Sequence, residues 1–196
     1  NVGTDVETSL ASLALAEQYP FFFAAGGIHP HDAKTADPKS LSELEEILKH
    51  KKMVAIGEVG LDFFRDHSPQ EKQKEVLRHF INLQKKIKKP LVLHCRDAYE
   101  DLIALFKEEI PPPYQGIMHC FSSDKPMMTR LVDLGFYISF AGPLTSIFWP
   151  TAKLVILRGL KAKSKLVSSL IRMVWPSTTK VSAVVLILLI TPQTLG

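Results

Sequence analysis

Residues 54–65, VAIGEVGLDFFR, form the stretch from which the fold is most readily inferred. A short apolar run leads to Glu58, and Asp62 and Arg65 follow closely behind it. Apolar runs of this length are typical of buried strands. The parallel strands of α/β barrels carry active-site residues at their carboxyl ends. We therefore expect a central strand over residues 54–57 that places the Glu58 carboxylate at such a site.

Two later apolar runs lead to a histidine in the same way. The segment PLVLHCRD reaches His94, and the segment GIMHCF reaches His119. Carboxylate and neutral imidazole groups on separate rigid elements are ligands that divalent metal ions select. Taken singly, Glu58 is compatible with a loop carboxylate, and each histidine with a hydrogen-bonded core residue. Together they predict a metal site made of Glu58, His94 and His119.

Strand-like and helix-like segments alternate along the chain, as βα units of a parallel sheet do. No glycine-rich phosphate fingerprint follows any of the expected strands, which favours a barrel over a doubly wound dinucleotide fold. A complete eight-stranded barrel typically needs about 250 residues. The expected fold class is therefore α/β, an incomplete TIM-type (β/α) barrel. Strands are expected at 1–4 (the end of one), 21–28, 54–57, 91–95, 117–120 and 136–140, and helices at 5–19, 40–50, 68–89, 97–110 and 125–134.

Three of the expected helices begin with a recognisable signature. The segments from Ser40 to Glu43 and from Ser68 to Glu71 each have the Ser-x-x-Glu pattern of a capping box. Asp97 stands where a side-chain N-cap would begin the helix that follows His94.

Charge is distributed unevenly along the 196 residues, although the formal net charge is only +4. The first 133 residues hold all 20 acidic residues against 17 Lys and Arg, a net charge of −3. The last 63 residues hold no Asp or Glu and seven Lys and Arg, a net charge of +7. Ordinary globular sequence mixes both signs throughout. The C-terminal part therefore differs in kind from the rest, although it includes stretches compatible with a basic helix (153–171) and a strand (184–190).

Only two cysteines are present, and each directly follows a candidate ligand histidine. A disulfide framework is not expected from this usage, so we predict two free thiols, a reducing compartment and a cytoplasmic location. No signal-peptide pattern is visible at Asn1. The apolar run 183–190 is too short for a membrane span, which takes about 20 residues. We expect no membrane association.

Four further polar residues are candidates for substrate contact, and each also has a simpler interpretation. His29 and His31 lie in a loop after an expected strand, where they would contact substrate or phosphate, or remain solvated beside the Pro30 turn. Arg65 is suited to bidentate phosphate binding, or to an ion pair with Asp62 or Asp66. Asp62 itself fits either a site residue or a loop carboxylate.

These motifs together resemble the TatD family of metal-dependent deoxyribonucleases, amidohydrolase-like barrels. The resemblance covers residues 1–146, and its motifs follow one another in the family's order. We expect 1–146 to form a partial TatD-like barrel and 147–196 a divergent basic and apolar tail. The resemblance rests on GGIHPHDA from Gly26, AIGEVGLDFFR from Ala55, PLVLHCRDA from Pro90, GIMHCFSSD from Gly116 and LGFYISFAGPLT from Leu134.

The resemblance implies hydrolysis of DNA phosphodiester bonds with one or two divalent ions per chain, Mg²⁺, Mn²⁺ or Zn²⁺. It makes Glu58 both a metal contact and the catalytic carboxylate, and His94 and His119 ligands. The family's N-terminal His-x-His pair and its late ligand Asp have no counterpart here, which predicts truncation at the N-terminus and weak or absent nuclease activity. Two alternatives remain open: an inactive remnant that binds metal or nucleic acid, and a barrel hydrolase with another substrate.

Overall fold

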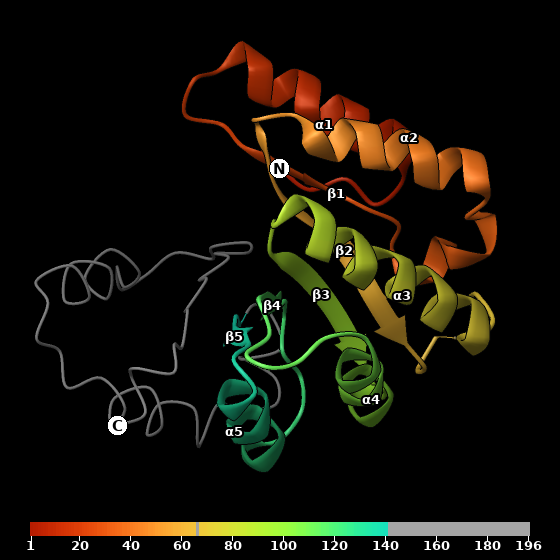
Figure 1. The fold of residues 1–196 in the computed structure, drawn as a ribbon, viewed down its shortest axis with the longest axis vertical. Coiled ribbons are helices and arrows are strands. Elements are labelled where there is room, and N and C mark those ends of the chain that lie inside the picture. The colour runs from red at the N-terminus through yellow and green to blue at the C-terminus, as the bar shows by residue number, and fades with distance from the viewer. Residues whose placement is uncertain (66, 141–196) are drawn as a thin grey trace, which may run out of the picture.

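The computed structural model describes residues 1–65 and 67–140. Their strands form one parallel sheet in the order β1-β2-β3-β4-β5, with each strand beside its neighbour in the sequence (Figure 1). The strands are β1 (Ala24–Gly26), β2 (Met53–Asp62), β3 (Leu91–Arg96), β4 (Gly116–Met118) and β5 (Tyr137–Ile138). The helices are α1 (Val6–Gln18), the 3-10 helix η1 (Pro30–Thr35), α2 (Pro38–Lys49), α3 (Gln70–Ile87), α4 (Tyr99–Glu109) and α5 (Lys125–Asp133).

The topology is that of a TIM-type barrel. Every crossover leads to the next strand in the same direction, so right-handed connections place all the helices on one face of the sheet. Figure 1 shows the helices along the outer side of this curved sheet. The α/β barrel class is thus confirmed, and the described residues supply five of its strands. A single parallel bridge, Val2 to Ala25, continues the sheet beyond β1, where the end of a strand was expected.

Apolar packing between sheet and helices holds these units together. The rings of Phe106, Tyr114 and Phe136 form a buried cluster, and their centroids lie 4.9–5.2 Å apart. The α3 helix buries Val76, Leu77, Phe80 and Ile81 in the same core, at the spacing expected from the sequence. None of the helices in the described part of the chain is long and apolar enough to cross a membrane.

The central strand is longer than predicted. We expected it to end before Glu58, but β2 continues to Asp62 and pairs with β3 along its whole second half. The reason lies in Gly57 and Gly60, which have φ of 147° and 146°. A Cβ at Gly60 would stand 1.9 Å from the His94 carbonyl oxygen, so only glycine permits this approach. Glu58 therefore lies within an irregular part of the strand rather than at its end.

All three predicted helix starts were wrong. Helix α2 begins earlier, because Asp37 caps it by accepting a 2.7 Å hydrogen bond from the Ser40 amide, with Pro38 at the first position. Ser68 caps nothing, because its hydroxyl donates to the His31 carbonyl at 2.7 Å. Asp97 has a left-handed φ of 53°, and α4 starts two residues later.

Expectations for the C-terminal part fall beyond the described residues. The helix predicted at 153–171, the strand at 184–190 and the division between 1–146 and 147–196 all stay predictions.

Candidate metal centre

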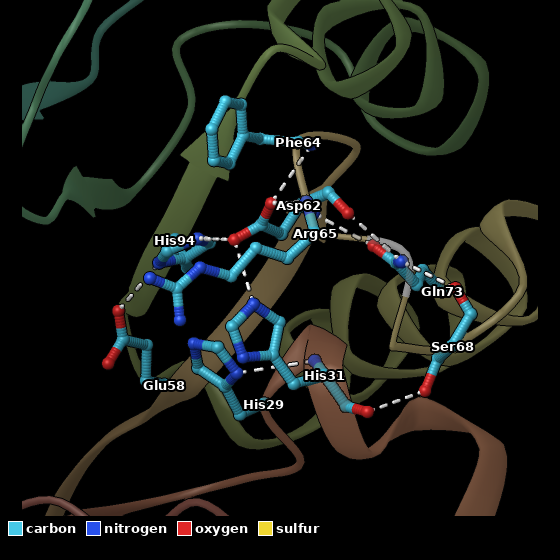
Figure 2. Close-up of polar contacts among 9 residues, drawn as sticks. All are labelled: His29, His31, Glu58, Asp62, Phe64, Arg65, Ser68, Gln73 and His94. Atoms are coloured by element: carbon cyan, nitrogen blue, oxygen red, sulfur yellow. Dashed lines mark hydrogen bonds and ion pairs between the residues drawn. The ribbon is translucent and has the colours of Figure 1, made fainter.

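Three neighbouring strands bring four polar side chains to one edge of the sheet. His29 and His31 follow β1, with His31 in η1, while Glu58 lies in β2 and His94 in β3. Gly60 is in register with His94 across the ladder, so Glu58 and His94 lie close together on adjacent strands. Figure 2 shows the side chains of these residues converging on one another.

His29, Glu58 and His94 form the first of two possible metal-binding groups. One ligand atom from each residue lies within 4.8 Å of the others. Glu58 Oε1 is 3.4 Å from His94 Nδ1, and the rings of His29 and His94 have centroids 4.8 Å apart. Two imidazoles and one carboxylate form a donor set that suits a divalent transition metal. The residues therefore fit the metal that the sequence predicts.

His31, Asp62 and His94 form the second group, and His94 belongs to both. Asp62 Oδ2 lies 2.8 Å from His31 Nε2 and 2.9 Å from His94 Nε2. Histidines that ligate metals commonly have their second nitrogen held by a carboxylate, which fixes ring orientation. Asp62 meets this description for His94, whose other nitrogen faces Glu58. The arrangement thus suits one ion at Glu58 with Asp62 behind it, and its chemistry also accommodates a second.

The position of Asp62 depends on a residue that the sequence reading missed. Gln73 in α3 is buried, and its side-chain oxygen accepts a 2.8 Å hydrogen bond from the Asp62 backbone amide. Its side-chain nitrogen donates to the carbonyls of Asp62 and Ser68 at 3.1 and 2.8 Å. The sequence did carry a signal for this residue, because Gln73 is a polar residue one turn before Val76 and Leu77 on the apolar stripe of the helix.

The predicted ligand His119 has a different environment. It follows β4 by one residue, and its Nε2 lies 3.0 Å from the Sγ of Cys120. Within the described residues it joins neither three-residue ligand group, although its charge lowers the pKa of Glu58. Its role as a ligand stays a prediction, while His29, predicted as a substrate contact, lies among the candidate ligands.

Arg65 is exposed. Its backbone amide, and not its guanidinium, donates a 2.9 Å hydrogen bond to Asp62 Oδ1. No ion pair joins Arg65 to a carboxylate among residues 1–65 and 67–140. Figure 2 shows its side chain extending back across the cluster. The two cysteines are free thiols, with Cys95 buried and Cys120 half-buried.

The pKa values reflect this crowding of charge. Burial lowers the pKa of His29 to about 4, with the charge of His94 acting in the same direction. Burial also opposes the charge on His94, but hydrogen bonds to Glu58 and Asp62 prevail and raise its pKa. Burial likewise opposes the charge on Asp62, yet the Arg65 amide and both histidines lower its pKa to about 2. Burial is outweighed at Glu58 too, where His94 is the main cause of a lowered pKa. Both carboxylates are therefore ionised at neutral pH.

Comparison with known proteins indicates the family of the chain. The chain matches the family model of TatD related DNase over residues 1–155. It is 42% identical over 144 residues to the metal-dependent hydrolase YabD of Bacillus subtilis, covering 74% of this chain and 56% of that protein. It is 33% identical over 140 residues to the 3'-5' ssDNA/RNA exonuclease TatD of Salmonella typhimurium, covering 71% of this chain and 54% of that protein.

Solved structures give the same result. The fold matches YJJV, a TatD homolog from Escherichia coli, with a TM-score of 0.65 and 34% identity, over 70% of this chain and 53% of that one. It also matches a TatD family hydrolase from Entamoeba histolytica, with a TM-score of 0.63 and 26% identity, over 70% of this chain and 49% of that one. The chain spans about half the length of these relatives. The match of the family model to most of the chain shows that it belongs to the TatD related DNase family.

Proposed function

We propose that this chain is a metal-dependent hydrolase of nucleic acid phosphodiester bonds, with DNA as a substrate, centred on Glu58 and His94. The observation that carries the proposal is the pair of ligand groups sharing His94 at one sheet edge. The relatives YabD and TatD, a metal-dependent hydrolase and an ssDNA/RNA exonuclease by name, support it. The two free thiols support the cytoplasmic location predicted from the sequence.

The chain's own residues would hold the metal and orient the reaction. His29, Glu58 and His94 are the proposed ligands, and His119 remains a proposed further one. Imidazole donors favour Zn²⁺ or Mn²⁺ over Mg²⁺, which prefers oxygen ligands. When bound, such an ion supplies a water nucleophile at neutral pH and offsets charge on the phosphate.

The remaining site residues act around this centre. Asp62 holds the rings of His31 and His94 by hydrogen bonds of 2.8 and 2.9 Å. Arg65 is exposed beside them, where its guanidinium suits a phosphate oxygen pair. His29 and His31 remain proposed substrate contacts as well, because their rings pack together at 4.4 Å on the same side.

Turnover in this polypeptide is proposed to be slow. No Asp or Glu occurs from Leu134 to Gly196, so these residues offer no counterpart to the late Asp implied by the family resemblance. Positioned acid–base groups contribute roughly 10²–10⁴-fold to enzymatic rates. We expect cleavage slower by about that factor than in the Salmonella relative assayed in parallel.

The test is release of nucleotides from end-labelled single-stranded DNA by the full chain, with Mg²⁺, Mn²⁺ or Zn²⁺ supplied in turn. The proposal requires slow release that chelation stops and that Glu58→Gln removes. Glu108→Gln, which alters an exposed carboxylate on α4, is the matched control and should leave the rate unchanged. Release no faster than that of Glu58→Gln with all three ions would refute hydrolysis.

A second candidate follows from the acid-free region after Leu134, with its net charge of +7. Such a region suits electrostatic binding of nucleic acid without catalysis. Salt-sensitive DNA affinity and metal binding, without cleavage, would favour this inactive remnant. A barrel hydrolase acting on esters or amides would instead cleave those substrates in a Glu58-dependent manner.

A further inference from the structure

Phe64 is an exposed aromatic side chain at the edge of the candidate metal centre. It follows the last residue of β2 by two positions, and 57% of its surface is accessible. Within residues 1–65 and 67–140, the other strongly exposed phenylalanines are Phe21 and Phe23, which precede β1 and so lie at the opposite, amino end of the strands. In Figure 2 the Phe64 ring projects from the turn after β2, with Asp62 between it and His31.

Arg96 covers one face of this ring. Its guanidinium carbon lies 3.6 Å from the ring centroid, and Arg96 is the last residue of β3. Cation–π contact of this kind holds an aromatic ring in place. Since more than half of Phe64 is accessible, the opposite face of the ring is open to solvent.

The same carboxylate that orients the histidines also fixes the backbone of this turn. Asp62 Oδ1 accepts hydrogen bonds of 3.1 and 2.9 Å from the backbone amides of Phe64 and Arg65. The other oxygen, Oδ2, contacts His31 and His94. The open ring is therefore held at a defined place relative to the candidate metal ligands. Two arginines flank this ring. Arg65 is the next residue along the turn, and Arg96 is the last residue of β3.

We infer that Phe64, backed by Arg96, is a stacking platform for one nucleobase of a single-stranded substrate, with the two arginines facing its phosphates. The inference rests on the proposed function and adds the residue that receives the base. Aromatic stacking of a base contributes roughly 1–3 kcal/mol and tolerates any sequence, since every base has a π face. A double helix keeps its bases stacked on each other, so the platform selects single strands.

The experiment measures binding, not cleavage, so that it is independent of turnover. Fluorescence anisotropy is recorded for the full chain in chelator, with a labelled oligothymidylate of about 12 nucleotides and an abasic strand of equal length. Phe64→Leu should weaken oligothymidylate binding about 5- to 10-fold and leave abasic binding unchanged. Phe64→Trp should restore the affinity, and Phe21→Leu, the same change at an exposed phenylalanine far from the site, should have no effect.

Several results would overturn the inference. One is an oligothymidylate affinity that Phe64→Leu leaves unaltered. Another is an equal loss of affinity for the two strands, which would indicate a charge or folding effect. The third is no measurable binding of oligothymidylate by the wild type. The cleavage assay separates this inference from the proposed function. Metal-dependent cleavage that is insensitive to Phe64 refutes the platform alone, and base-dependent binding without cleavage refutes hydrolysis alone.

Discussion

Glu58 and Asp62 lie four residues apart on one strand, yet their surroundings differ sharply. The Asp62 side chain is 2% accessible and accepts hydrogen bonds from two backbone amides besides its two histidine contacts. The Glu58 side chain is 17% accessible, and within residues 1–65 and 67–140 it has one close polar partner, His94 Nδ1 at 3.4 Å. Asp62 therefore has less capacity left for a metal ion than Glu58, whose second carboxylate oxygen has no hydrogen-bond partner among the described residues. We therefore expect Asp62 to organise the site and Glu58 to bind the metal ion.

Replacing Asp62 by Ala should give the largest effect on stability. The change leaves the amides of Phe64 and Arg65 without an acceptor and two histidines without a counter-charge, which costs about 3 kcal/mol. Chemical denaturation of the metal-free chain measures the free energy of unfolding. Glu58→Gln, the matched change on the same strand, should lower it by less than about 1 kcal/mol. Equal losses of unfolding free energy in the two variants would contradict the claim that Asp62, and not Glu58, organises the site.

Acid should act mainly through Asp62. Its pKa is lowered from 3.8 to about 2 in the folded chain, so the stabilisation it provides is complete above its unfolded value. That stabilisation, about 2 kcal/mol, is lost as the pH falls from roughly 4 to 2. Denaturation midpoints measured across this range should fall less steeply in Asp62→Asn than in the wild type. An identical slope in both proteins would show that other carboxylates dominate.

Gln73→Leu tests how Asp62 is held. The variant loses three buried hydrogen bonds to the Asp62 and Ser68 backbone, and we expect a loss of about 1–2 kcal/mol. Gln70→Leu, at the exposed start of the same helix, should change stability by no more than about 0.5 kcal/mol. Metal affinity should also fall in Gln73→Leu, because the ring of His94 is oriented through Asp62. An unchanged free energy of unfolding would contradict the claim that Gln73 holds Asp62 in place.

Metal binding should compete with a proton on His94. Burial opposes the charge on this ring, but the two carboxylates prevail and raise its pKa, so the metal-free ring keeps its proton to a higher pH than a free imidazole would. Binding releases that proton. The affinity should therefore fall as the pH drops through this raised value, and calorimetry in buffers of different ionisation enthalpy should detect proton release. A pH-independent affinity with no proton released would contradict the raised pKa.

Much of the fold and part of the site followed from the sequence alone. Apolar runs separated by amphipathic helices predicted the parallel sheet. Glu58 and His94 were predicted to share a metal site with His119, and the structure brings the first two side chains together. The length of β2 was not predicted, because it depends on how closely Gly60 approaches the His94 carbonyl on another strand. That His29 lies among the candidate ligands was missed for the same reason, since no local pattern encodes which strand ends meet.

The helix starts failed for a related reason. Ser68 has the local signature of a cap, but the hydroxyl bonds the His31 carbonyl and the Lys34 amide, at 2.7 and 3.0 Å. Tertiary contacts thus took a group that local rules assign to the helix. Gln73 was overlooked for the opposite reason, because a polar residue on an apolar stripe gives no hint of its partner.

Calorimetric titration of the metal-free full chain with Zn²⁺ and Mn²⁺ tests the central claim most directly. The wild type should bind with an affinity that Glu58→Gln, His94→Ala and His29→Ala each reduce at least about 10-fold. Glu108→Gln on α4 should leave it unchanged, and His119→Ala decides whether that histidine is a further ligand. Binding that is equally strong in the wild type and in Glu58→Gln would contradict a metal centre built on Glu58 and His94.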